Sequence, residues 1–159
     1  MEFIMQPIGF VRGGRGQATK DHWGANRCRI ELDPDRFGPE ALAGLEQVSH
    51  IEAVFFFHLH ADEPTETGAR HPRDRADWPK VGIFAQRGRM RPNRIGLSAC
   101  RVIAVNGLAV EVEGLDAIDG TPVLDIKPWF PVFGPRGEVR VPDWPGEMLA
   151  DYFAEPHTK

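Results

Sequence analysis

The chain has little cysteine and no long apolar run. Cys28 and Cys100 are its two thiols, and a pair so far apart, without a recognisable secretion signal, favours reduced and buried cysteines over a disulfide. Neither has an obvious activating neighbour, which argues against a catalytic thiol. No segment approaches the ~20 consecutive apolar residues that a membrane helix needs. We therefore expect a cytoplasmic protein that does not bind a membrane.

Common nucleotide-binding and hydrolase motifs are also missing. No Gly-x-Gly-x-x-Gly segment follows an apolar run, and no Gly-x-x-x-x-Gly-Lys-Ser/Thr segment occurs. The sequence therefore gives no support to a dinucleotide-binding or P-loop protein. Ser98 does not lie in a Gly-x-Ser-x-Gly turn, so an acyl-transfer hydrolase is equally unsupported.

Glycine and proline, in contrast, are abundant. The 17 glycines and 14 prolines recur every few residues and leave little room for long helices. Residues 106–107 (Asn-Gly) lie between two apolar runs and predict a hairpin turn in which both residues have positive φ. The expected strands cover residues 3–12, 27–32, 51–60, 81–85, 95–105, 108–112 and 121–126. With short helices at 39–45 and 145–153, this pattern predicts an all-β fold, a small antiparallel β-barrel or a sandwich.

Basic charge is concentrated in one segment of an acidic chain. The formal net charge is -4, yet residues 82–101 hold five arginines and no acidic residue. Arginines on a loop between strands commonly bind phosphate or carboxylate, although a solvated basic loop would have the same composition. Arg89, Arg91 and Arg94 are the residues of this segment that we expect to contact an anion.

Two histidines suggest, but do not establish, a metal site. If residues 51–60 form one strand, His58 and His60 share a face of it, because side chains alternate. No third ligand stands at a telling spacing. Polar histidines at the end of a strand remain the simpler interpretation, and no metal is expected.

The acidic residues near position 120 have several explanations. Asp119 precedes Gly120 and is typical of a turn. Asp125 lies late in an apolar strand and is followed by Lys127. It could bind a ligand or form a surface ion pair with the lysine, and its position alone does not decide between them.

Three ordered segments resemble a known family. They are residues 6–12 (Gln-Pro-Ile-Gly-Phe-Val-Arg), residues 84–87 with 91–98 (Phe-Ala-Gln-Arg and Arg-Pro-Asn-Arg-Ile-Gly-Leu-Ser), and residues 119–128 (Asp-Gly-Thr-Pro-Val-Leu-Asp-Ile-Lys-Pro). Together they are similar to the TsaA-like (YaeB-like) family, which includes the tRNA adenosine methyltransferases called tRNA-methyltransferase O. The likeness covers about residues 5–140, so residues 1–159 are expected to form a single domain of this kind.

The resemblance implies a β-barrel that binds S-adenosyl-L-methionine, usually as a homodimer. The implied reaction is methyl transfer to the exocyclic nitrogen of a modified adenosine beside the anticodon in tRNA, with no role for DNA. With such a substrate, Arg89, Arg91 and Arg94 are expected to contact RNA phosphates. The cofactor residues that it implies are Asp21, His58, Leu59, Arg87, Leu97, Asp125, Ile126, Lys127 and Pro128. Arg87 could hold the cofactor carboxylate by a bidentate pair, Leu97 could flank its adenine, and Asp125 could face its ribose hydroxyls or sulfonium. No catalytic base is identified.

Two departures weaken the assignment of the substrate. The early loop at residues 19–24 reads Thr-Lys-Asp-His-Trp-Gly, whereas the tRNA enzymes carry Pro-Arg-Gln there. Leu59 and His60 stand where those enzymes have Gln and Asn. The alternative is a module that binds or senses S-adenosyl-L-methionine without chemistry, and a metal-dependent small-barrel enzyme is a third interpretation. The polar excursion at residues 61–80 could be a lid, a substrate arm or a flexible surface loop.

Overall fold

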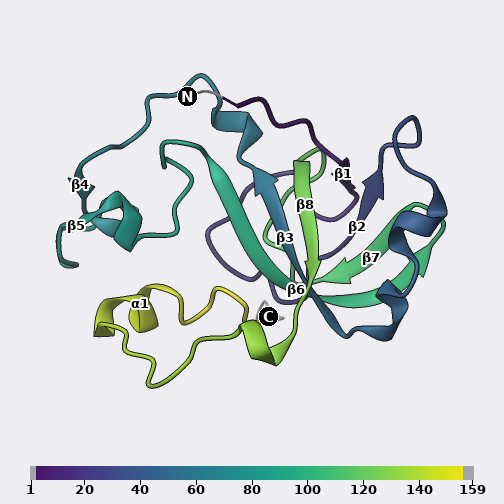
Figure 1. Ribbon diagram of the computed structural model, residues 1–159. Helices are drawn as coiled ribbons and strands as arrows, with labels where there is room; N and C mark the ends of the chain where they lie inside the picture. Colours follow the sequence, from purple (N-terminus) through teal and green to yellow (C-terminus); the bar gives the residue numbers. More distant parts are fainter. Residues whose placement is uncertain (1–2, 156–159) are drawn as a thin grey trace.

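The computed structural model describes residues 3–155 and has a closed antiparallel barrel at its centre (Figure 1). Six strands close it in the order β1, β2, β7, β6, β3, β8. Their bounds are β1 Gly9–Arg12, β2 Arg27–Leu32, β3 His50–Phe56, β6 Ile95–Asn106, β7 Ala109–Glu113 and β8 Pro122–Pro128. The predicted all-β barrel is confirmed, and the sandwich alternative is wrong because β1 pairs with both β2 and β8 and so closes the ring.

The barrel interior is filled by alternate residues of each strand. In β2, Cys28, Ile30 and Leu32 point inward, while the charged residues that alternate with them, Arg27, Arg29 and Glu31, face outward. This is the period-two pattern of a strand with one buried face. Val110 and Val112 of β7 are completely buried in the same core. The prediction for residues 27–32 is confirmed at both ends.

The helices are short and mostly 3₁₀. They are η1 Pro39–Leu42, η2 Leu45–Gln47, η3 His58–His60, η4 Pro72–Asp74, η5 Ile83–Ala85, η6 Pro131–Phe133 and α1 Asp143–Met148. The helix predicted at 39–45 is interrupted at Gly44, whose φ of 88° is left-handed and ends the first turn. Within residues 3–155, no helix has the length and apolar character to cross a membrane.

The hairpin between β6 and β7 differs in detail from the prediction. Asn106 pairs with Ala109, so the two loop residues are Gly107 and Leu108. Gly107 has a φ of 60°, whereas Asn106 and Leu108 do not have positive φ. A positive φ at the first loop residue alone fits a type II′ turn, which also matches the twist of the strands. The Asn-Gly signal located the hairpin, but the turn lies one residue later.

Three expected strands are shorter than predicted. β1 begins at Gly9, β3 ends at Phe56, and the run at 81–85 forms only β5, Val81–Gly82, before η5. Phe56 pairs with Ile95, the first residue of β6, and beyond this pair one backbone hydrogen bond of 2.9 Å, from the Phe57 amide to the Arg94 carbonyl, precedes η3. β5 pairs with β4, Ala69–Arg70, in a separate two-stranded sheet. The polar excursion thus contains regular structure.

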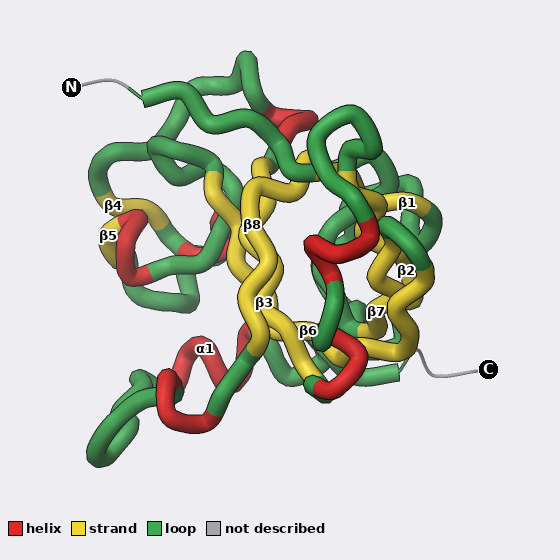
Figure 2. Tube along the Cα trace, turned by 45° about the vertical axis from the view of Figure 1, so that its right-hand side comes forward, coloured by secondary structure: helices red, strands yellow, loops and turns green. Residues whose placement is uncertain are grey.

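The long strand β6 changes partners along its length. It pairs with β3 over residues 95–101 and with β7 only from Arg101 onward. Its first half therefore has one edge without a strand partner among the described residues. Both views place the β4–β5 sheet and α1 on the side of the barrel away from β2 and β7 (Figures 1 and 2).

Candidate functional site

The outer face of three adjacent strands carries two of the predicted cofactor residues in one row. Leu97 of β6 lies opposite Val54 of β3, which lies opposite Asp125 of β8. Leu97 stands between buried Gly96 and Ser98 and is 44% exposed, so it points away from the core. Strands lie about 4.8 Å apart, which puts Leu97 and Asp125 about 10 Å from each other along the row.

A bulge in β8 makes this row possible. Val54 pairs with Asp125 but the next residue, Phe55, pairs with Val123, so β8 has one additional residue here. The bulge lets buried Val123 and outward Asp125 both face partners in β3. Asp125 accepts a hydrogen bond from the Ile126 amide at 2.9 Å and pairs with Lys127 at 2.8 Å. This exposed ion pair, with the Asp125 charge, also raises the pKa of Lys127.

Arg87 is held against the unpaired edge of β6. Its Nη2 atom donates a hydrogen bond to the Leu97 carbonyl at 2.7 Å. The preceding residue is fixed as well, because the Gln86 side-chain amide donates to the carbonyls of Arg70 and Val81 at 3.1 and 2.9 Å. Among residues 3–155, no carboxylate forms an ion pair with Arg87. The structure thus brings Arg87 and Leu97 together and leaves the guanidinium available to an anion.

Asp21 is already paired. Its two carboxylate oxygens accept hydrogen bonds from Arg73 at 2.6 and 3.1 Å, and both side chains are largely buried. Arg15 supports the same loop, because it donates to the Asp21 carbonyl at 2.9 Å and stacks over the Trp23 ring. In this arrangement Asp21 connects the early loop to η4 in the excursion.

His58 and Leu59 lie beyond the end of β3, in η3. The expectation that His58 and His60 share a strand face is wrong, because β3 ends at Phe56. His60 contacts Glu63 at 2.8 Å, and this hydrogen bond is the main cause of the lowered pKa of the Glu63 carboxyl. Across residues 3–155, no three His, Cys, Asp or Glu side chains gather in a way that could hold a metal ion.

The arginines predicted to bind RNA are not equivalent. Arg91 donates to the Gln86 carbonyl at 3.2 Å, and Arg94 donates to the Glu63 carbonyl. Arg89 is exposed and makes no hydrogen bond or ion pair within the described residues. Arg91 and Arg94 keep their charges but shape the loop, whereas Arg89 is free to contact a phosphate.

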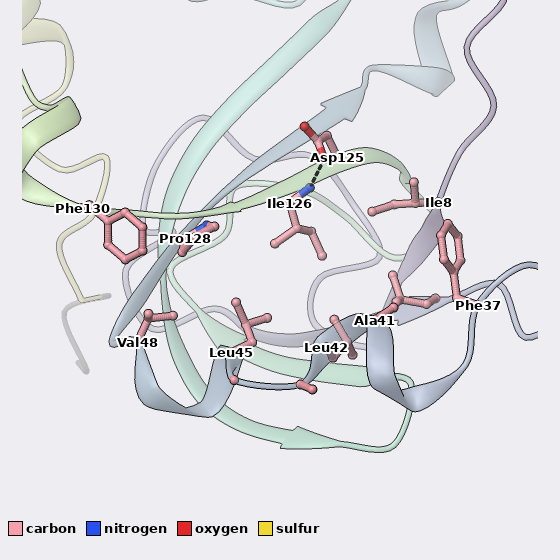
Figure 3. Close-up of a pocket in the computed structure, with 13 residues that line it drawn as sticks. Ile8, Phe37, Ala41, Leu42, Leu45, Val48, Asp125, Ile126, Pro128 and Phe130 are labelled. Atoms are coloured by element: carbon pink, nitrogen blue, oxygen red, sulfur yellow. Dashed lines mark hydrogen bonds between the residues drawn. The ribbon is translucent and has the colours of Figure 1, made fainter.

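The Asp-Ile-Lys-Pro stretch does not face a single site. Ile126 and Pro128 line a cavity of about 480 Å³ beneath β8, whose wall also includes apolar residues of η1 and η2 (Figure 3). Figure 3 shows the Asp125 carboxylate on the opposite side of the strand from this cavity. The Asp125 carboxylate and Lys127 therefore lie on the outer face with Leu97, whereas the Ile126 and Pro128 side chains face the cavity, whose wall Asp125 also joins.

A buried polar cluster near Arg87 had no signal in the sequence. Ser98 is only 5% exposed and donates to Asp116, whose other oxygen accepts the Tyr152 hydroxyl at 2.5 Å. Burial, followed by the Asp116 charge, raises the pKa of Tyr152, while the charges of Arg87 and Arg73 oppose that shift. The cluster residues lie 18 and 36 positions apart along the chain. The one available hint was that the chain has a single tyrosine.

Comparison with known proteins identifies the family. The sequence profile described as the tRNA-methyltransferase O N-terminal domain matches residues 18–134, which is most of the chain. The chain belongs to the tRNA-methyltransferase O family. The resemblance inferred from the sequence motifs is thereby confirmed.

Members of the tRNA-methyltransferase O family with solved structures share the fold. A crystal structure of TrmO superimposes with a TM-score of 0.71 at 34% identity and covers 89% of this chain and 64% of that chain. A crystal structure of TrmO from Pseudomonas aeruginosa gives a TM-score of 0.69 at 34% identity, with 88% and 62% covered.

Relatives in the tRNA-methyltransferase O family carry two kinds of name. The human tRNA (adenine(37)-N6)-methyltransferase is 38% identical over 126 residues, which cover 79% of this chain and 26% of that protein. A Methanothermobacter thermautotrophicus protein named "Probable S-adenosyl-L-methionine-binding protein" is 33% identical over 134 residues, covering 82% and 92%. The chain spans about half the length of two further relatives from Pseudomonas aeruginosa.

Proposed function

We propose that this protein is a methyltransferase that uses S-adenosyl-L-methionine and acts on the exocyclic nitrogen of an adenosine in tRNA. The observation that carries the proposal is the position of Arg87, fixed by the Leu97 carbonyl at 2.7 Å beside the exposed Leu97 side chain. Family membership and the names of the relatives support the same activity.

The residues present suit the cofactor's parts. The Arg87 guanidinium, which has no ion-pair partner within residues 3–155, suits the amino-acid carboxylate, since Arg binds carboxylates through two parallel N–H bonds. Leu97 and Val54 form an apolar strip that suits the adenine, and Asp125, about 10 Å from Leu97 across two strand spacings, suits a ribose hydroxyl or the sulfonium. Lys127 would have to share Asp125 with such a ligand. When bound, the cofactor supplies an activated methyl group.

The protein's part in such a transfer is mainly positioning. Methyl transfer to a neutral amine nitrogen is an in-line displacement, and holding two reactants in line is worth roughly 7–11 kcal/mol. Arg87 would fix one end of the donor and Leu97 would exclude water beside it. No side chain in the described structure is assigned as the base that accepts the proton released from the amine.

The proposed RNA partner is supported by the basic loop. Arg89 makes no hydrogen bond or ion pair with any other described residue, and Arg87, Arg91 and Arg94 add positive charge to the same loop although the chain is acidic overall. We expect modest RNA affinity with a shallow salt dependence, because few arginines would contact phosphates. The two free and buried thiols fit the reducing conditions of the cytoplasm, where we place the reaction.

We also propose a homodimer. The segment after β8 exposes a run of large apolar side chains, including Val132 at 66% and Phe133 at 77%. Exposed apolar surface of this kind is typical of an interface. Leu97 is exposed on the outer face of the barrel, which would leave the proposed cofactor site open on one side unless a second subunit covered it.

A binding module without chemistry is the second candidate. It is favoured by the early loop, where Asp21 pairs with Arg73 instead of facing a ligand. Transfer of labelled methyl groups from S-adenosyl-L-methionine to total tRNA separates the two candidates. Incorporation supports the enzyme, and binding of the cofactor without incorporation supports the module.

Calorimetric titration with S-adenosyl-L-methionine tests the common element of both candidates. The protein should bind at micromolar strength, and Arg87→Ala should lose binding while its unfolding temperature is retained. Binding that survives Arg87→Ala would overturn the site described above. No binding by the unaltered protein would remove the cofactor from both candidates.

A further inference from the structure

The last described segment of the chain is docked on the early loop. The His22 and Trp23 amides donate to the carbonyls of Asp151 and Tyr152 at 3.0 and 2.7 Å. The backbone of this segment passes so close to Gly24 that a Cβ there would lie 2.0 Å from the Phe153 carbonyl oxygen. Glycine is required at position 24 by this close approach. The segment at residues 151–154 is thus held by its backbone, and the docking aims the Tyr152 side chain at the barrel.

The Tyr152 hydroxyl reaches β6 through two other side chains. It donates to Asp116 at 2.5 Å, and the second Asp116 oxygen accepts the buried Ser98 hydroxyl. Ser98 directly follows Leu97, whose carbonyl holds Arg87. Within the part of the chain that the structure describes, this half of β6 pairs with β3 along one edge and with no strand along the other. A polar path therefore runs from Tyr152 to the strand edge that orients the Arg87 guanidinium.

We propose that Tyr152 is a positioning residue of the cofactor site, which acts through Asp116 and Ser98 to hold the Leu97 carbonyl and Arg87 in place. The inference rests on the proposed function, because it assigns Arg87 to the cofactor carboxylate. It adds the segment at residues 151–154 to a site otherwise built from the barrel and its basic loop.

Electrostatics give the hydroxyl a second role. The charges of Arg87 and Arg73 lower the pKa of Tyr152 against the effect of burial, so both guanidinium groups act on the end of the path that Asp116 shares with Tyr152. The Tyr152 and Ser98 hydroxyls satisfy one Asp116 oxygen each. If Tyr152 loses its hydroxyl, the freed oxygen is left to attract Arg87, since a half-buried carboxylate without a donor is costly. Arg87 would then be drawn away from its ligand.

The first test observes Arg87 without any ligand. Nitrogen-15 NMR of the guanidinium groups, with the Arg87 signal assigned from Arg87→Lys, should show a slowly exchanging Arg87 in the unaltered protein. Tyr152→Phe and Ser98→Ala break the path at opposite ends, and each should shift or broaden that signal. An Arg87 signal unchanged in both variants would overturn the proposal.

The second test is a double-mutant cycle on binding of S-adenosyl-L-methionine. Tyr152→Phe should weaken binding about tenfold, as loss of a hydrogen bond to a charged group does. The same substitution should have little effect in an Arg87→Lys background, because Tyr152 acts through Arg87. Equal weakening in both backgrounds, or none in either, would overturn the proposal.

A matched control separates positioning from simple loosening of the segment. His22→Asn removes the contact of 3.3 Å between the imidazole and the Ala154 carbonyl but leaves the Tyr152 path intact. It should leave the affinity for S-adenosyl-L-methionine within twofold, and a loss as large as that of Tyr152→Phe would overturn the proposal. If the unaltered protein binds no cofactor, the proposed function fails, and the NMR comparison still decides whether Tyr152 positions Arg87.

Discussion

Gly96 lies directly beside the ring of Phe55, and a Cβ at this glycine would be 2.3 Å from Phe55 Cε2. Phe55 is itself 2% exposed and packed in the barrel core. The ring has little room to move, because side chains in cores are close-packed. Because position 96 has no side chain, β6 can pair with β3 while the Phe55 ring of β3 occupies the space beside Gly96.

Gly96→Ala should destabilise the barrel. Overpacking a core costs about 1–3 kcal/mol, and the shift at Phe55 should reach Leu97, the next residue. The free energy of unfolding from urea titration measures the effect. Gly16→Ala is the control, because a Cβ there meets nothing within 4 Å and its φ is not positive. Equal stability of the two variants would contradict the packing argument.

Asp21→Asn should release the excursion from the early loop. The pair between Asp21 and Arg73 is two-pronged and largely buried, so its loss matters more than that of an exposed pair. We expect trypsin to cleave the excursion about threefold to tenfold faster, since a lost charged hydrogen bond is worth about 1 kcal/mol or more. Asp77→Asn removes an exposed pair with Arg75 inside the excursion and should change the rate little. Similar rates for both variants would show that Asp21 does not anchor the excursion.

Stability should fall in alkali from about pH 9 upward. Burial raises the pKa of Cys28 from 9.0 to about 11 and that of Cys100 to about 12. Because the folded pKa values are higher, the unfolded chain loses these protons first, and the stability present below pH 9 is lost as pH rises toward the folded values. Urea titrations at pH 8 and pH 10 measure the loss.

The variant Cys28→Ala with Cys100→Ala should lose less stability between these two pH values. Its slope should not vanish, because the raised pKa of Tyr152 acts in the same direction. An unchanged slope in the cysteine-free protein would assign the alkaline loss to other groups.

Arg89→Ala should weaken tRNA binding and reduce the salt slope by about 1, as loss of one phosphate contact does. Arg91→Ala should act differently, because Arg91 also supports the loop by donating to the Gln86 carbonyl. Fluorescence anisotropy with labelled tRNA over a salt series measures both. Arg136→Ala removes an equal charge from an exposed position outside the basic loop and should have a smaller effect. If Arg89→Ala and Arg136→Ala change tRNA affinity and its salt slope equally, binding depends on the net charge of the protein and not on a contact of Arg89.

Local patterns predicted those parts of the fold that depend on local chemistry. Residues 27–32 alternate arginine and glutamate with apolar residues, and they form β2 with the expected ends. The end of β3 could not be predicted in this way. The aromatic run continues to Phe57, but the strand ends at Phe56, because its partner β6 begins at Ile95 and the preceding Arg94 has a left-handed φ of 48°. Where a strand ends depends on its partner, which the run itself does not encode.

The candidate site, like the fold, could be predicted from the sequence only in part. The resemblance of motifs indicated Arg87 and Leu97. In the structure these residues are in contact, because Arg87 Nη2 donates a hydrogen bond of 2.7 Å to the Leu97 carbonyl oxygen. It also grouped Asp125 with Ile126, whose side chains point to opposite sides of β8 because successive side chains alternate along a strand. Tyr152 could not be predicted from the sequence. Its contact with Asp116 depends on backbone hydrogen bonds between residues 151–152 and the early loop, which the spacing of residues along the chain does not indicate.

The docking of residues 151–154 on the early loop also has a consequence for the order of events during synthesis. This segment is translated after every barrel strand, since β8 ends at Pro128. The barrel can therefore close while Asp116 still lacks the hydrogen bond from the tyrosine. We expect a nascent chain to pass through a state with a formed barrel and a loosely held Arg87, and the arrival of Tyr152 to complete the site last.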